Sequence, residues 1–210
     1  MLFPLTRLFL CTFLLAAIAP RAFAEPTFIF ETGTPEWKGE RLELPPGFAP
    51  NLGWTGVEHI RFAPGMFEAE APNFFSYVIV FLLEPGSDVT EAALKRETLI
   101  YYRGLSQAVM AGKQQSVDTS KFTVALAPSD EKSGAPAVAP TATAWTGTLE
   151  WVEPFATQLP QKLFLELHVW EHEGQPVVLS CISPVAPVSP AVDDPWKALR
   201  SIRAAFRFEP

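Results

Sequence analysis

The fold is decided by ten residues, Phe74-Phe75-Ser76-Tyr77-Val78-Ile79-Val80-Phe81-Leu82-Leu83. Both alternating sets of positions in this run are apolar apart from Ser76, whereas a strand with one solvated face alternates apolar with polar residues. The β-branched and aromatic content, with Pro72 before the run and Glu84-Pro85-Gly86 after it, favours a strand over a buried helix. We therefore expect a strand in the middle of a sheet that is covered on both faces.

The first 24 residues have the pattern of a signal peptide. Arg7 supplies a positive charge, Leu8–Ala19 form an apolar run, and Ala22-Phe23-Ala24 is a cleavage signal that predicts cutting before Glu25. This run of twelve residues, interrupted by Cys11 and Thr12, is too short to span a bilayer, which needs about 20. We expect a periplasmic or secreted protein with no membrane span after cleavage; an uncleaved membrane anchor is the alternative.

Composition limits the classes of function. The chain has 16 Lys and Arg against 23 Asp and Glu, a net charge of −7, which argues against nucleic acid and anionic membranes as partners. Removing 24 of 210 residues leaves 186, a length typical of one domain over 25–210. Only Cys181 would remain, so an internal disulfide is excluded, and its apolar surroundings indicate a buried, unreactive thiol.

Periodicity predicts seven strands and two helices in the mature chain. Asp88 begins the first helix as its cap and Gly112 ends it, while Asp194 caps the second helix and Pro195 is its first residue. Residues 128–143 lack periodicity and predict a flexible surface loop. The expected strands are 41–44, 57–62, 73–83, 122–126, 145–152, 162–170 and 177–182.

The last helix has an apolar stripe and a basic side. We expect Arg200 and Arg203 to face water. The expected stripe consists of Trp196, Leu199, Ile202 and Phe206.

The order of these elements favours an α+β fold. Neighbouring strands without regular helical crossovers indicate a mainly antiparallel sheet, and two amphipathic helices can cover its two faces as an α/β/α sandwich. The alternative is a β-sandwich or a lipocalin-like barrel with an appended helix.

Several segments resemble an uncharacterised family of exported bacterial proteins. The end of the chain, a meander followed by a helix with Trp196 and Phe206, is separately similar to the PsbP-like fold. The first resemblance implies export and the second implies architecture, and neither implies an activity or a set of functional residues. The segments that carry the family resemblance are 43–50, 56–67, 74–77, 101–105 and 151–155.

The histidines suggest one candidate site. On the strand expected over 162–170, Glu166, His168 and Trp170 share one face with Phe164, which we call the mixed face, opposite a face of leucines and Val169. His168 and His172 are four residues apart, about 13 Å on a strand and too far for one ion unless the chain turns. The mixed face, with His59, could bind a metal or a small polar ligand; ordinary surface residues leading into a turn are the simpler interpretation.

Other chemistry finds little support in the sequence. A Gly-x-Ser-x-Gly elbow and a phosphate-binding glycine loop are both absent. Tyr101 and Tyr102 could line a site, although core packing is the commoner role of such a pair. The glutamates that alternate along the strands are expected to face solvent: Glu58, Glu150, Glu153, Glu166 and Glu171.

The sequence therefore predicts a non-enzymatic exported domain that binds a protein or a small molecule through one face of its sheet, with Glu166, His168 and Trp170 as the candidate binding face and with no cofactor. The alternative is a small metal-dependent hydrolase that uses Glu166, His168 and His172. A structural role in the cell envelope, with 128–143 as a tether, is a third possibility.

Overall fold

A computed structural model describes residues 25–129, 136, 139, 141–187 and 195–209. The predicted signal peptide, most of the 128–143 loop and the predicted cap Asp194 lie outside these residues. The elements are β1 (Phe28–Ile29), β2 (Lys38–Leu44), β3 (Gly56–Phe62), β4 (Tyr77–Leu83), α1 (Glu91–Gly112), the 3-10 turn η1 (Thr119–Lys121), β5 (Thr123–Pro128), β6 (Thr143–Val152), β7 (Pro160–His172), β8 (Gln175–Ser183), α2 (Pro195–Ala205) and β9 (Arg207–Phe208).

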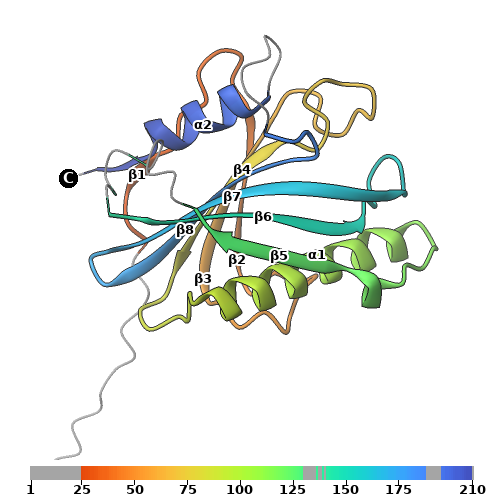
Figure 1. Ribbon diagram of the computed structural model, residues 1–210, viewed down its shortest axis with the longest axis horizontal. Helices are drawn as coiled ribbons and strands as arrows, with labels where there is room; N and C mark the ends of the chain where they lie inside the picture. The colour runs from red at the N-terminus through yellow and green to blue at the C-terminus, as the bar shows by residue number, and fades with distance from the viewer. Residues whose placement is uncertain (1–24, 130–135, 137–138, 140, 188–194, 210) are drawn as a thin grey trace, which may run out of the picture.

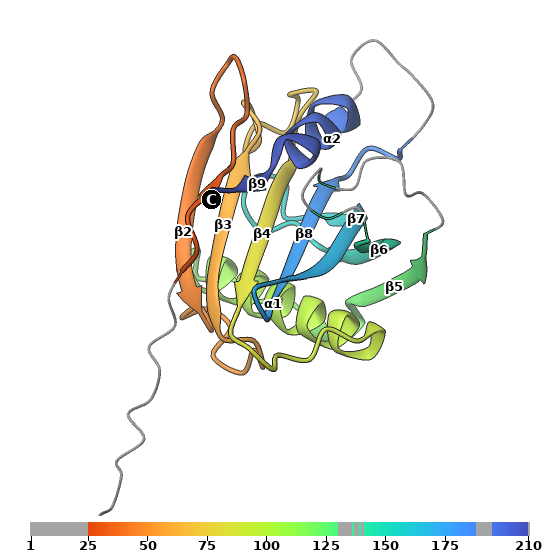
Figure 2. The ribbon, with the colours of Figure 1, turned by 90° about the vertical axis from the view of Figure 1, so that its left-hand side faces the viewer.

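Seven strands form one antiparallel sheet in the order β2-β3-β4-β8-β7-β6-β5, and β1 pairs with β9 in a separate two-stranded ladder. The prediction of an α+β fold with a mainly antiparallel sheet is confirmed. The sheet is open, with β2 and β5 at its two edges (Figure 2). The alternative of a β-sandwich or closed barrel is therefore wrong for the described part of the chain.

Strand β4 lies between β3 and β8, and all seven of its residues are buried. This confirms that the apolar run forms an interior strand. The strand begins at Tyr77, however, and not at position 73 as predicted. Phe75 has a positive φ of 48°, outside the β region, and its N–H donates to the carbonyl of Met66, so the chain turns before it enters the sheet.

The two helices cover opposite faces of the sheet (Figure 1). Ile79 and Phe81 of β4 belong to the core on the side of α1, whereas Val78 and Val80 belong to the core on the side of α2. Because successive side chains of a strand point to opposite faces, a strand that is apolar at every position needs a cover on each side. The apolar side chains on both faces of β4 thus explain why a helix covers each face of the sheet.

The helix starts follow local capping rules with one correction. Thr90, and not Asp88, is the N-cap of α1: its hydroxyl accepts from the N–H of Ala93, while Asp88 Oδ1 accepts from the N–H of Thr90, 3.0 Å away. Pro195 is the first residue of α2, as predicted. The predicted apolar stripe of this helix is buried in the core. Within the described residues, the helices are all too short or too polar to cross a membrane.

Strand β2 forms one edge of the sheet, and two hollows lie beside it. Most of its residues are exposed, and Lys38, Glu40, Arg41 and Glu43 are charged, a composition that discourages pairing with another chain. Residues of alternate parity on β2 and β3 point to opposite sides of this two-stranded ribbon, so each side lines its own hollow.

Candidate functional site

The mixed face of β7 exists, but it is buried beneath α2. Glu166, His168 and Trp170 point to the same side of the sheet and are only 5%, 3% and 9% exposed. Trp170 contacts Phe206, which follows α2, with ring centroids 5.9 Å apart. The interpretation of these residues as surface residues is therefore wrong, because α2 and the segment after it cover this half of the sheet.

Glu166 is held by two arginines of α2. Its carboxylate oxygens lie 2.5 Å from Arg200 Nη2 and 2.7 Å from Arg203 Nη1. Burial alone would raise the pKa of Glu166, but the hydrogen bonds from both arginines outweigh burial and lower it. Arg203 is only 2% exposed, so its expected position in water is wrong. A buried carboxylate needs a cation, and Arg203 supplies it from the facing helix.

His168 lies next to this ion cluster and is neutral. Neither ring nitrogen has a hydrogen-bond partner in the described residues, and burial, helped by the charge of Arg203, lowers the pKa of His168 to about 4. His172 stacks on Phe208 with ring centroids 3.6 Å apart. Across the residues that the structure describes, no three His, Cys, Asp or Glu side chains are placed to hold one metal ion.

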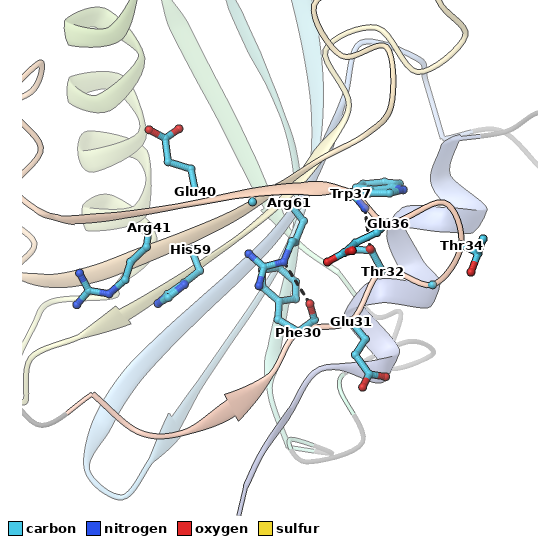
Figure 3. Close-up of a pocket in the computed structure, with 12 residues that line it drawn as sticks. Phe30, Glu31, Thr32, Thr34, Glu36, Trp37, Glu40, Arg41, His59 and Arg61 are labelled. Carbon is cyan, nitrogen blue, oxygen red and sulfur yellow. Dashed lines mark hydrogen bonds between the residues drawn. The ribbon is translucent and has the colours of Figure 1, made fainter.

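A wide polar hollow, of about 910 Å³, lies between residues 30–37 and the outer side of β2 and β3 (Figure 3). Figure 3 shows His59, Arg41 and Arg61 on one side of the ribbon and Glu40 on the other. The β2–β3 register brings these basic side chains to one side of the ribbon, because Arg41 lies opposite His59 and Gly39 lies opposite Arg61. The absence of a side chain at Gly39 makes room for the Arg61 guanidinium, since a Cβ there would lie 2.5 Å from Nη1.

The basic side chains of the polar hollow have partners within the protein. Glu25 accepts from Arg41 at 2.7 Å and contacts His59 at 2.5 Å. Arg61 donates to the carbonyls of Phe30 and Ile60, at 3.2 and 3.0 Å, and its guanidinium lies 4.7 Å from the centre of the Phe30 ring. Burial lowers the pKa of His59, which opposes the effect of Glu25. A hollow this open, whose cations are already paired, offers little for a small ligand.

A second hollow, the apolar cavity, lies on the opposite side of β2 and β3, under α1. It measures about 420 Å³. Phe67, half exposed, is the most solvent-accessible of its aromatic residues. The cavity is lined by Glu40, Leu42, Phe48, Ile60, Phe62, Met66, Phe67, Phe75, Tyr77, Tyr101, Leu105 and Phe155.

Glu58 lies on the same side of β3 as the apolar cavity, but it is not among the described residues that line the cavity. It is opposite Leu42 in the β2–β3 register, two residues from Ile60, and its Oε1 accepts from the Tyr101 hydroxyl at 3.0 Å. The side chain is fully buried, and Oε2 has no hydrogen-bond partner in the described residues. Burial, with a smaller effect of Glu40, raises the pKa of Glu58 to about 8. The expectation that Glu58 faces solvent is wrong because α1 covers this side of β3.

Two carboxyls lie on this side of the β2–β3 ribbon: Glu40 lines the cavity, and Glu58 is buried beside Tyr101. For the Tyr101–Tyr102 pair, the sequence favoured core packing, with lining a site as the alternative. Both tyrosines are buried in the core, and Tyr101 also lines the cavity. The Tyr102 hydroxyl contacts the Tyr77 hydroxyl, which fixes the ring of Tyr77 in the cavity wall.

Comparison of the chain with models of protein families, with curated proteins and with solved structures finds no match.

Proposed function

We propose that this chain is an exported, non-enzymatic binding module that takes a small, largely apolar ligand into the apolar cavity. The observation that carries the proposal is a cavity of about 420 Å³ whose described lining is mostly aromatic and aliphatic, with the hydroxyls of Tyr77 and Tyr101 and the carboxyl of Glu40 as its polar groups. Ligand sites usually measure about 300–1,000 Å³ and combine apolar walls with a few convergent polar groups.

Export is the second part of the proposal. It rests on the pattern of residues 1–24 and on the resemblance to exported bacterial proteins. Expression of the full chain in a bacterial host should give a periplasmic or secreted product whose first residue is Glu25 by mass spectrometry. Replacing Ala22 and Ala24 by Leu should block cutting, and a mature chain that still begins at Glu25 would contradict the assignment.

The architecture fits the proposed relation to the PsbP-like fold. Its support is the open antiparallel sheet with one helix on each face and the meander that precedes α2. The hydrolase alternative has no comparable support, since Glu166 is engaged by Arg200 and Arg203 and His172 stacks on Phe208.

Filling the cavity tests the binding proposal. The neutral fluorescent probe N-phenyl-1-naphthylamine should bind saturably to the mature protein with increased emission. Leu105→Trp puts an indole where the cavity is, and it should weaken binding tenfold or more. Leu159→Trp, at an exposed residue outside the cavity, is the matched control and should bind like the parent. Equal binding to both variants would refute the proposed site.

A further inference from the structure

We propose that a cleft beside α1 binds a small organic carboxylate, with Arg103 as its charged partner. The cleft measures about 350 Å³ and lies between α1, the segment 48–51 and η1. In the described linings it shares only Phe48 with the apolar cavity. The inference therefore goes beyond the proposed function and does not depend on it.

Helical spacing and one glycine form the cleft. Ile100, Arg103 and Gln107 follow one another at intervals of three and four residues, so they share one face of α1. Gly104 also lines the cleft, and a Cβ at this position would lie 2.3 Å from the carbonyl oxygen of Phe48. The absence of a side chain there lets the segment after Phe48 lie directly against the helix.

Arg103 is the only charged side chain in the described lining of the cleft. Arg96, about two turns earlier on α1, pairs with Glu97 at 2.6 Å, whereas no carboxylate in the described residues forms an ion pair with Arg103. The chain has 23 acidic against 16 basic residues, so acids to pair with this arginine are not scarce. A partly buried cation without a carboxylate partner is the group that a ligand anion would complete.

The guanidinium of Arg103 is held in place and still offers a free nitrogen. Nη2 donates to the carbonyl of Phe122 at 3.2 Å, and Nε is buried without an acceptor. Nη1 has no partner in the described residues and is not buried, so a ligand oxygen can reach it from the cleft. A charge-assisted hydrogen bond from arginine to a carboxylate is stronger than one between neutral groups.

The other polar groups of the cleft are neutral. The described lining contains neither Asp nor Glu, and Gln107 Nε2 donates to Thr119 Oγ1 at 3.1 Å, which leaves the hydroxyl proton of Thr119 able to donate to a ligand oxygen. Asp118 precedes Thr119 in the chain, but its carboxylate accepts from the N–H of Ser120 and pairs with Lys121. Nothing in the described lining therefore opposes an anion.

The number of cations sets the charge of the ligand. One guanidinium balances one carboxylate, whereas a phosphate dianion would keep an uncompensated charge in a chain whose net charge is −7. Phe48 and Ile100 supply apolar surface beside Arg103. A monocarboxylate with a short apolar or aromatic part matches both the charge and the walls of the cleft.

An NMR titration of the isotope-labelled mature protein tests the inference. Benzoate and benzamide have nearly the same shape and differ in charge. We expect benzoate to shift the backbone amides of Arg103 and Gln107 saturably and to bind at least tenfold more tightly than benzamide at low salt. Added NaCl should weaken the binding of benzoate and leave that of benzamide unchanged, because salt screens the charge of Arg103.

Three variants locate the charge. Arg103→Met keeps an unbranched side chain without the cation and should reduce the affinity for benzoate to that for benzamide. Arg103→Lys keeps the charge without the planar fork and should retain a smaller preference for benzoate. Arg207→Met, at an exposed arginine outside the cleft, is the matched control and should bind like the parent.

Several results would overturn the carboxylate site. They are equal binding of benzoate and benzamide to the parent, the absence of saturable shifts with benzoate, and shifts that lie around Arg61 in the polar hollow. A folded Arg103→Met that keeps the preference of the parent also refutes it. If circular dichroism shows this variant to be unfolded, the comparison of the two probes on the parent still decides. The apolar cavity is tested separately with the neutral naphthylamine probe.

Discussion

Glu58 should make the protein less stable as pH rises through the neutral range. Its pKa is raised from 4.5 to about 8 in the folded state. An acid whose folded pKa is raised favours its protonated form in the fold, so unfolding releases its proton between these two pH values. Stability should therefore be highest below pH 4.5 as far as this group is concerned, fall as pH rises from 4.5 to 8, and level off above 8.

The magnitude follows from linkage. One pH unit corresponds to about 1.4 kcal/mol per proton, so the loss between pH 5 and pH 7.5 is about 3 kcal/mol. Gln at position 58 resembles the protonated acid: its amide oxygen can accept from Tyr101, and it never ionises. Glu58→Gln should thus match the parent within about 1 kcal/mol at pH 5 and exceed its free energy of unfolding by about 3 kcal/mol at pH 7.5.

Thermal unfolding of parent and variant at both pH values measures this difference. For a domain of this size 1 kcal/mol shifts Tm by about 2–4 °C, so the variant should melt about 6–12 °C above the parent at pH 7.5 and close to it at pH 5. His59 and His168, whose pKa values are lowered, act in both proteins and cancel in the comparison. Glu171→Gln serves as the exposed control. A Tm difference that is the same at both pH values would refute the buried, unpaired state of Glu58.

Three further predictions concern the two cores. Ile79→Ala empties a buried site in the interior strand and should cost about 2–5 kcal/mol in the free energy of unfolding, measured by urea denaturation at pH 6. Arg203→Ala leaves Glu166 with one arginine in a buried place and should cost about 3–5 kcal/mol, with Arg207→Ala, an exposed position, as a near-neutral control. Burial raises the pKa of the Cys181 thiol to about 12, so a disulfide reagent should leave the folded protein unmodified at pH 8 and react with one thiol in denaturant; rapid reaction of the native protein would contradict the buried assignment.

Local pattern was sufficient to predict much of the fold. The uniformly apolar run around Ile79 indicated a strand covered on both faces, and the structure has a helix on each side. Alternation in β7 correctly separated the mixed face from the leucine face, and Pro195 correctly marked the start of α2. These predictions depend on the periods of strand and helix, which a single sequence reveals.

The candidate site could not be predicted in the same way. A glutamate on a strand is usually solvated, and what makes Glu166 an exception is Arg203, which lies 37 residues further along the chain. The hydrogen-bond partner of Glu58, Tyr101, lies 43 residues away on a different element. Burial of a charged side chain depends on which distant group faces it, and the order of apolar and polar residues in one strand contains no such information.

The two buried glutamates of the sheet have opposite electrostatic surroundings. Glu166 and Glu58 both project from interior strands beneath a helix, yet Glu166 receives two arginines from α2, whereas Glu58 receives one tyrosine hydroxyl from α1. The difference sets the direction of each pKa: burial raises that of Glu58, whereas the two arginines lower that of Glu166 against the effect of burial. An apolar residue at position 58 would avoid the cost of burying a carboxyl. Removing the acid should therefore stabilise the protein at position 58 above neutral pH, whereas at position 166 it would leave Arg203 buried without its carboxylate partner.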